Sequence, residues 1–475
     1  MPFPIVVRRP RALLLRLWLC AALLPAAALH ASDVLAVDHA KRTAMPGPGE
    51  RDLDGTAGAH ELRPRVDPVA VVESTPALGA EALIRKVLQR NPGIAAMRAA
   101  ADAAGAKIES AGALDDPMVS YLVAPNTAGG PGQGLNQNIQ VSQAIPWPGT
   151  LDLRIRAARA DAQSAERQAD DVRLRLAAVT RGVYAEWYYV HRALAVNAEN
   201  RVLVKRLEPV AETAYASGQA PQQDVLQAQV ELVRLQNQRL ELERRRRVVM
   251  AKINTLLNQP PDTALAAPED LPATRALPDY TLLQTAALAG YPMLQSLGAR
   301  VDASRDRVAL ARKNNYPEFK LMAGYNSIMD LPAKRLTLGV AINIPFGGNH
   351  RGAVGEARAR AHEAEARLAD ARAQLLGELD QSWAAAAQAI DTIKLDSRKL
   401  LPLSKLNFQA AEADYRGGNG DFLKLITAQQ QYLAAKLELA RARADLYTQL
   451  ASLDYQTSGA VWPASASATT LEATP

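Results

Sequence analysis

The sequence contains two copies of one pattern, and this duplication constrains the fold more than any other feature. The copies are 200 residues apart at both ends of the pattern and 199 apart in its middle, so the halves differ by a single-residue gap. The recurring positions are Asn91-Pro92 and Tyr291-Pro292, Pro117 and Pro317, Ile145-Pro146 and Ile344-Pro345, Tyr215 and Tyr415, Gly218 and Gly418, and Ala228-Gln229 and Ala428-Gln429. Solenoid units are only about 20–50 residues long, so this period indicates a duplicated domain-sized unit.

Each unit predicts a helix, two short strands, one very long helix, a glycine-containing turn and a second long helix. Two strand hairpins cannot close a sheet by themselves, and long coiled-coil arms need partners, so the repeat points towards an oligomer. We expect a first structural repeat over 79–270, with a hairpin near 117–146 and helices near 147–258, and a second over 271–458, with a hairpin near 317–345 and helices near 348–457.

Residues 1–31 are typical of a secretory signal peptide. A basic segment precedes the apolar run Leu17–Leu29, which Pro25 interrupts and which is shorter than the roughly 20 residues needed to span a bilayer. The only cysteine, Cys20, lies inside this run after Leu19 rather than after a small residue, which argues against lipidation. The exported chain then contains no disulfide and no thiol chemistry.

The flanking segments predict no chemistry. Residues 32–78, which include Pro46-Gly47-Pro48-Gly49, predict a flexible leader, and residues 459–475, rich in Ala, Ser and Thr, predict a disordered tail.

Composition agrees with a helix-rich coiled coil, because 48% of residues are hydrophobic but only 5% are aromatic. The net charge of +6 includes four arginines of the leader, Arg8, Arg9, Arg11 and Arg16, so the mature chain carries about 6 − 4 = +2. A nearly balanced chain gives no electrostatic argument for nucleic acid. The basic run Arg244–Arg247 fits either a solvated stretch of helix or a partner-binding patch.

Alternation of apolar and polar residues marks the strands. It is clearest in 336–344, where Leu336, Leu338, Val340, Ile342 and Ile344 face one way. Strands of about nine residues can cross a bilayer when tilted, but a half-buried hairpin of a soluble domain would show the same period. Alternation alone leaves the two interpretations open.

Heptad spacing in the long helices decides between them. Apolar or small residues follow a strict 4,3 alternation at Leu151, Ile155, Ala158, Ala162, Ala165, Ala169, Val172, Leu176, Val179 and Val183. The second copy repeats it at Ala357, Ala361, Ala364, Leu368, Ala371 and Leu375. This is the pattern of a coiled coil. We expect Pro209 and Pro402 to kink or break the two long helices before their turns.

These features together resemble the TolC-type outer-membrane efflux channels, the outer membrane factor family, over about residues 80–457. The resemblance rests on Gln143-Ala144-Ile145-Pro146-Trp147-Pro148-Gly149 with its partner Ile344-Pro345-Phe346-Gly347-Gly348, and on the turns Tyr215-Ala216-Ser217-Gly218 and Tyr415-Arg416-Gly417-Gly418. It implies a mainly α protein with a β-barrel portion, in which three chains share one twelve-stranded barrel in the outer membrane and a periplasmic α-helical tunnel.

Strand number alone leaves the oligomer open. Four strands per chain fall below the smallest membrane barrel, about eight strands, and either two or three chains would suffice. The resemblance favours the homotrimer. Small and polar residues on the inward face, Asn138, Gln140, Thr337 and Asn343, are then expected to line the barrel lumen.

The resemblance also implies partners. The turns at Gly218, Gly417 and Gly418 are expected to dock a periplasmic adaptor that is joined to an inner-membrane pump. Channels of this family carry acidic residues just after these turns, where they constrict the pore, so the resemblance places a possible pore constriction at Asp224, Asp421, Lys424 and Thr427. The first repeat keeps Asp224, whereas the second has Lys424 and Thr427 at the matching positions and Asp421 nearby, so an acidic ring is in doubt.

Two other classes of protein fit the sequence less well. A periplasmic coiled-coil adaptor or scaffold without a barrel shares the heptads but leaves the two symmetric hairpins unexplained. An exported enzyme needs converging titratable groups, whereas the six histidines are scattered and no nucleophile, phosphate-binding or zinc motif occurs. We therefore expect no enzyme, no cofactor and no high-affinity metal site. Pro146-Trp147-Pro148-Gly149 most resembles channels paired with heavy-metal exporters, with drugs as the alternative cargo.

Overall fold

The computed structural model describes residues 77–124, 136–273, 276–327, 335–345 and 349–461. The expected signal peptide lies outside these residues, as do nearly all of the leader and the tail.

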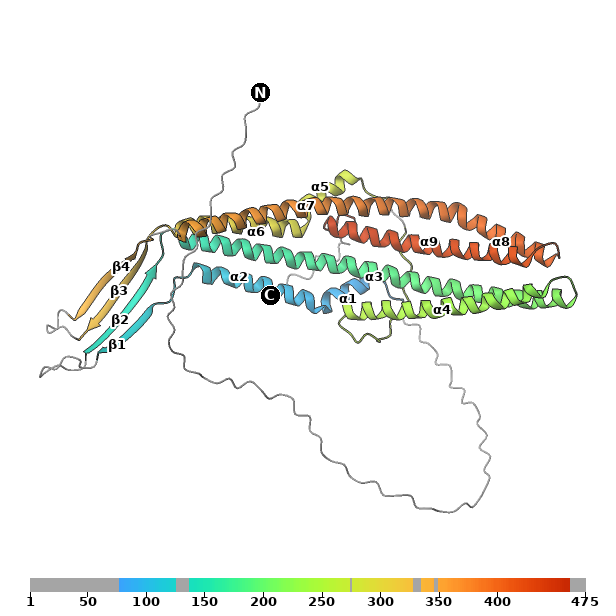
Figure 1. The fold of residues 1–475 in the computed structure, drawn as a ribbon, viewed down its shortest axis with the longest axis horizontal. Helices are drawn as coiled ribbons and strands as arrows, with labels where there is room; N and C mark the ends of the chain where they lie inside the picture. Colours follow the sequence, from blue (N-terminus) through green and yellow to red (C-terminus); the bar gives the residue numbers. More distant parts are fainter. Residues whose placement is uncertain (1–76, 125–135, 274–275, 328–334, 346–348, 462–475) are drawn as a thin grey trace, which may run out of the picture. The chain divides into compact units, whose positions relative to one another are not determined.

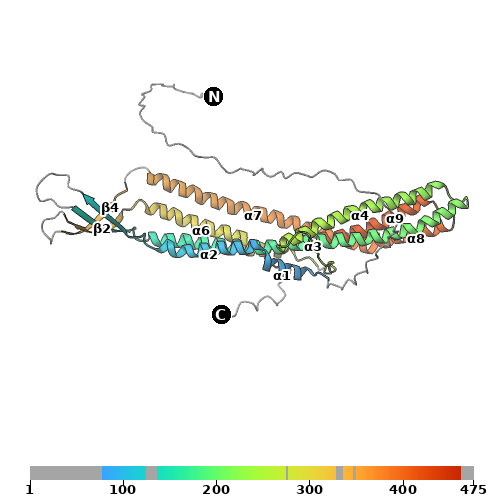
Figure 2. The ribbon, with the colours of Figure 1, turned by 90° about the horizontal axis from the view of Figure 1, so that it is seen from below.

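The first repeat comprises α1 (Ala80–Arg90), α2 (Pro92–Gly112), β1 (Met118–Ala124), β2 (Asn136–Ile145), α3 (Thr150–Ala216) and α4 (Gln222–Leu256). The second comprises α5 (Tyr280–Gly290), α6 (Pro292–Lys313), β3 (Glu318–Asn326), β4 (Leu336–Asn343), α7 (Asn349–Leu395), a π-helical turn (Asp396–Leu400), α8 (Leu401–Arg416) and α9 (Phe422–Gln456). Figure 1 shows that the strands lie at one end of the helices, and Figure 2 shows the α3–α4 and α8–α9 turns at the other.

The α1–α2 break follows from Asn91-Pro92. Proline is suited to the first position of α2, and the Asn91 side chain accepts a hydrogen bond from the Gly93 amide at 2.9 Å. The Asn91 amide also donates to the Leu256 carbonyl at 3.0 Å, which ties this break to the end of α4. Tyr291-Pro292 begins α6 in the same way.

The two prolines of the long helices behave differently. α3 is one helix of 67 residues, about 100 Å long, and Pro209 lies inside it, so the expected break at Pro209 is wrong. In the second repeat Pro402 directly follows the π-helical turn. Leu176 and Leu375 are 199 residues apart, whereas Tyr215 and Tyr415 are 200 apart, so the second helix has one extra residue in between. The wider i→i+5 turn absorbs that residue within a continuous helix.

The predicted heptad stripe accounts for only part of the packing of α3. In α7 the corresponding residues are half-buried or buried, and Leu375 joins a core with Leu379 and Leu446. In α3 Ala158 and Ala162 are buried, but Val179 is exposed. A second buried stripe runs along α3 at Leu153, Ala157, Ser164 and Asp171. This stripe arises because α3 packs against α2, α6, α4 and α9 within the chain.

Polar contacts within the core join the two repeats. Ser164 and Ser296 share a hydrogen bond of 2.9 Å, and the Tyr455 hydroxyl donates to Asp171 at 2.8 Å. Burial raises the pKa of the Asp171 carboxyl, and the Tyr455 hydrogen bond opposes that rise. Heptad analysis missed this stripe because it mixes Ser and Asp with apolar residues.

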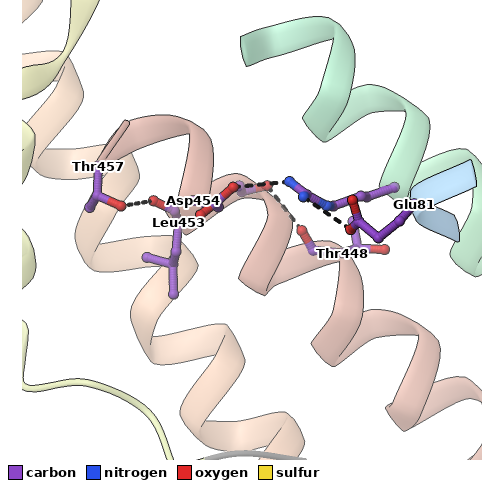
Figure 3. Close-up of polar contacts among 7 residues, drawn as sticks. Glu81, Thr448, Leu453, Asp454 and Thr457 are labelled. Carbon is purple, nitrogen blue, oxygen red and sulfur yellow. Dashed lines mark hydrogen bonds and ion pairs between the residues drawn. The ribbon is translucent and has the colours of Figure 1, made fainter. Parts of the chain in front are cut away.

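An ion-pair network holds α1, α3 and α9 together. The guanidinium of Arg181 lies 2.9 Å from Asp454 and 3.2 Å from Glu81 (Figure 3). Asp454 is buried and Glu81 is exposed. Among the described helices, none is long and apolar enough to cross a membrane.

Candidate functional site

The four strands form one antiparallel sheet in the order β1-β2-β3-β4. The hairpins of the two repeats meet where β2 pairs with β3. In this pair Ile139 lies opposite Tyr325 and Ile145 opposite Phe319. Within the described residues the outer edges of β1 and β4 have no strand partner. Unpaired edges carry free N–H and C=O groups, which must be satisfied by another chain or by water.

Register places all four predicted lumen residues on one face of this sheet. Residues directly opposite each other in an antiparallel pair share a face. Asn138 lies opposite Asn326, Gln140 opposite Gly324, Gly324 opposite Thr337, and Glu318 opposite Asn343. The Gln140 amide donates to the Met322 sulfur at 2.9 Å, and the Thr337 hydroxyl donates to the Gly324 carbonyl at 3.1 Å. This polar face also contains Met118 and Leu122 of β1, whose alternation is weaker.

The opposite face is apolar and exposed in the single chain. Its residues are Val119, Tyr121, Val123, Ile139, Val141, Ile145, Phe319, Leu321, Ala323, Tyr325, Leu336, Leu338, Val340 and Ile342. Leu338 is 82% exposed, which is far outside the range of a core residue. Gln137 and Gln143 interrupt this face, and the Gln143 amide donates to the Asp115 carbonyl at 2.6 Å. An apolar surface of this extent marks contact with a membrane or with another chain.

The two tip turns have the same backbone design. Gly218 and Gly418 adopt φ of 71° and 73°, in the left-handed region that favours glycine. The amide of Gly218 donates to Tyr215 and that of Gln219 to Ala214, and the second turn repeats both bonds one repeat later. This pattern is a Schellman motif, which satisfies the last carbonyls of α3 and α8. Gly417 has φ of −79° and closes α8 as an ordinary helical residue.

Gly420 is a functional position that sequence analysis missed. A Cβ atom at Gly420 would lie 2.7 Å from the Tyr415 backbone nitrogen, so only glycine fits the close return of the chain. The first repeat has Ala220 at the same position. The replacement of Ala220 by glycine in the second repeat was the sequence signal that could have identified this position.

An apolar cluster joins the tips of both repeats. Its buried members are Leu207, Ala211, Ala228, Phe408, Tyr415, Phe422, Leu425, Ile426 and Ala428. The rings of Tyr415 and Phe422 meet edge to face at 5.2 Å, and those of Phe408 and Tyr432 stack at 6.1 Å. The two helical hairpins therefore pack on each other at their turns.

Asp224 lies inside this contact rather than on the surface. It is buried, and its carboxylate accepts a hydrogen bond from the Tyr415 hydroxyl at 3.4 Å. Burial raises the pKa of Asp224, the charge of Asp421 raises it further, and the Tyr415 hydrogen bond lowers it. Burial and the Asp224 charge raise the pKa of Tyr415 to about 12, so its hydroxyl remains a donor at neutral pH.

The other predicted constriction residues are exposed. Asp421 caps α9 by accepting the Leu423 amide at 3.0 Å, and the Thr427 hydroxyl donates to the Leu423 carbonyl at 2.8 Å. Lys424 is also exposed. The structure therefore brings Asp421 near Asp224 but separates Asp224 from solvent.

The sequence also singles out the histidines and the basic run Arg244–Arg247. In the part of the chain that the structure describes, no three His, Cys, Asp or Glu residues are placed to hold a metal ion. His191 lies edge-on to Trp187 with ring centroids 4.3 Å apart, and burial lowers its pKa. In the basic run, Arg245 pairs with Glu186, whereas Arg244, Arg246 and Arg247 are exposed.

Long helices that pack as hairpins and continue into an open sheet with one apolar and one polar face define the subunit of a membrane-embedded channel. The outer membrane efflux protein family model matches residues 83–259 and 283–458, which together are most of the chain and include both repeats. The chain belongs to this family and is an outer-membrane efflux channel; in homologous channels the helical part lies in the periplasm. The family consists of passive channels.

Solved structures show the same fold. The outer-membrane channel OprN superposes with a TM-score of 0.72 at 21% identity, covering 80% of this chain and 90% of that one. VceC from Vibrio cholerae gives a TM-score of 0.70 at 19% identity, covering 80% and 96%. The transmembrane channel CusC gives 0.68 at 16% identity, covering 80% and 91%. No curated protein sequence matches the chain. The adaptor or scaffold alternative is not favoured, because it has no counterpart for the strands.

Proposed function

We propose that three copies of the chain form the exit duct of a tripartite efflux system. The observation that carries this proposal is the open four-stranded sheet, with unpaired β1 and β4 edges and one exposed apolar face. In a bilayer every backbone polar group must be paired, so these edges must pair with other copies. Three sheets of four strands close a barrel of twelve.

The two faces of the sheet support this arrangement. The apolar face would contact lipid, and the polar face, with Asn138, Gln140, Thr337 and Asn343, would line a water-filled lumen. The helices that follow the strands would continue this lumen through the periplasm as a tunnel.

Cysteine cross-linking tests the trimer. Ser120 on β1 and Ala341 on β4 lie on the polar face of the two edge strands. Ser120→Cys is combined in turn with Ala341→Cys, Gly339→Cys and Asn343→Cys, so that three registers between β1 and β4 of neighbouring copies are sampled. Oxidation in membranes should give covalent dimers and trimers and nothing larger. The mature chain is expected to contribute no other cysteine.

A matched control replaces Ser120→Cys with Gln140→Cys. Gln140 lies on the same face, but β2 is already paired on both sides. This control should remain monomeric. Monomers from every edge pair, or ladders beyond the trimer, would overturn the arrangement.

Docking at the tips completes the proposed system. The turns at Gly218 and Gly417-Gly418 end the longest helices, and the described tip exposes Asp421, Lys424 and Thr427 around them. These turns are the site that binds the hairpin of a periplasmic adaptor, which is itself joined to an inner-membrane pump. Photo-cross-linking from Lys424 in cells should capture such an adaptor, whereas cross-linking from Arg312, at the sheet end of α6, should not.

Selection of cargo is assigned to the inner-membrane partner. Cargo of the duct is a small toxic solute, and the Pro146-Trp147-Pro148-Gly149 junction favours heavy-metal cations over drugs. A deletion strain should become sensitive to copper, cobalt, zinc or cadmium, and the purified chain should bind none of them tightly. Sensitivity to organic drugs alone would reassign the cargo.

A further inference from the structure

An aromatic cluster lies where the sheet passes into the helices. The Trp147 ring, in the connection between β2 and α3, stacks on Tyr316 with centroids 5.1 Å apart and on Phe319 at 6.0 Å. Tyr316 is 47% exposed and follows the end of α6, whereas Phe319 is on the apolar face of β3. The cluster therefore extends the apolar face to its helical end.

Lysine accompanies these rings. The Lys313 ammonium lies 5.5 Å from the Tyr316 ring centroid and donates to the Pro148 carbonyl at 3.2 Å. Arg312 beside it is exposed. Among the described residues neither side chain forms an ion pair with a carboxylate. The nearest acidic residue along β3 is Glu318, which is on the opposite, polar face of the sheet.

A second aromatic row lies near the other end of the apolar face. Tyr121 and Tyr325 flank Ile139 across three adjacent strands, and both rings are exposed. Most residues between the two aromatic rows on this face are aliphatic, including Leu321, Val340 and Leu338.

The spacing of the two rows matches a bilayer. Tyr316, two residues before β3, and Tyr325 are nine residues apart, so at most about 30 Å separates them along the chain at roughly 3.3 Å per residue. A strand tilt of about 35–45° reduces this to about 21–24 Å, close to the roughly 25 Å apolar band of an outer-membrane barrel. Aromatic rings with a polar edge favour the two interfaces of that band.

From this geometry we infer that Trp147, Tyr316 and Lys313 form a phospholipid-headgroup site at the periplasmic surface of the outer membrane. The rings sit at the level of the headgroups, and the Lys313 ammonium binds the lipid phosphate while its methylene stem lies along Tyr316. This inference rests on the proposed membrane-embedded channel and defines the depth at which it sits.

The first arm of the test measures lipid binding. Purified full-length channel in detergent is titrated with short-chain phosphatidylglycerol, and bound lipid is counted by native mass spectrometry. Loss of one positive charge near a lipid surface is worth about fivefold in affinity. Lys313→Gln should weaken binding by about that factor, Lys313→Arg should retain it, and inorganic phosphate should not compete. The control is Lys405→Gln, an exposed lysine of α8, which should bind as the parent does.

The second arm measures depth. The channel is reconstituted in vesicles whose lipids carry bromine either near the headgroup or near the end of the acyl chain. Tryptophan emission should be quenched more strongly by bromine near the headgroup, and Trp147→Phe should remove that difference. Trp187→Phe, which replaces a buried ring of α3, should retain it.

The outcomes separate the site from the channel. The site would be overturned if Lys313→Gln bound lipid as tightly as the parent. It would also be overturned if Trp147→Phe left the difference in quenching between the two bromine positions unchanged. A cluster covered by a neighbouring copy would give this second result. If reconstituted protein with these results still forms trimers that conduct ions, the headgroup site alone has failed. If it forms neither trimers nor conducting channels, the proposed function has failed.

Discussion

Asp224 is a buried ionisable residue at a position where the pore constriction is expected. Its raised pKa means that the packed tip prefers the neutral carboxyl. The stability that this preference contributes is complete below the ordinary pKa of 3.8, and it is lost as pH rises through the raised value. The Tyr415 hydroxyl opposes this preference, because its hydrogen bond stabilises the ionised form of Asp224.

We expect Asp224→Asn to tighten the tip at neutral pH. The amide keeps an oxygen acceptor for Tyr415 and removes the buried charge. Tyr415→Phe should loosen the tip by about 1–2 kcal/mol, because it removes a hydrogen bond to a charged group. Channel current across planar bilayers measures both. The parent should conduct less as pH falls, whereas Asp224→Asn should conduct little at every pH. An Asn variant with the pH profile of the parent would contradict this assignment.

Gly418 provides a second test at this scale. Its left-handed φ makes Gly418→Ala cost about 1 kcal/mol, and Asn, which tolerates this conformation, should cost less. A Cβ atom at Gly418 would meet no atom within 4 Å, so a large side chain would project into open space. Gly418→Trp should assemble but fail to export, with Gly418→Asn as the active control. Cell growth on a toxic cargo and trimer content in membranes are the two readouts, and normal export by Gly418→Trp would remove the turn from the docking site.

At the scale of single elements, the π-helical turn accounts for the asymmetry between the repeats. Leu401 donates its amide to the Asp396 carbonyl, the i→i+5 bond of a wide turn. Pro402 has no N–H, so the Arg398 carbonyl has no i+4 donor. α3 has no such interruption at the equivalent residues 196–200. The second long helix therefore has a locally weaker backbone at 396–402.

Hydrogen exchange should detect this difference. We expect amides of 396–401 to exchange roughly tenfold faster than those of 196–201, which corresponds to about 1.4 kcal/mol less protection. Deleting Lys399, which is exposed, should restore the length of the first repeat and reduce the difference between the two rates, and Pro402 should account for what remains. Equal rates in the parent channel would show that the turn is no weaker than an ordinary helix.

Sequence periodicity predicted these elements well where one face is buried. The strands were found because their apolar and polar residues alternate, and the long helices because small residues recur in heptads. The π-helical turn was visible only as a change in interval from 199 to 200, which does not say where the extra residue lies. The contacts of Ser164, Asp171 and Asp224 escaped prediction because their partners are 132, 284 and 191 residues away.

At the scale of the whole molecule, the described chain is incomplete as a membrane protein. Its sheet has two unpaired edges, and the apolar face that should contact lipid is exposed. Its helical tips, in contrast, are packed on each other through a buried apolar cluster. The molecule therefore has surfaces without partners at its sheet end, whereas at its tip the two helical hairpins are held together within the chain.

Ion conductance by the purified full-length channel in planar lipid bilayers tests this account most directly. The parent should give discrete current steps of one small size, and Tyr415→Phe should give larger steps or longer openings, because the tip limits the current. An absence of discrete steps from both proteins, although both are trimeric and inserted in the bilayer, would contradict the claim that this chain forms a channel whose current is limited at its tips.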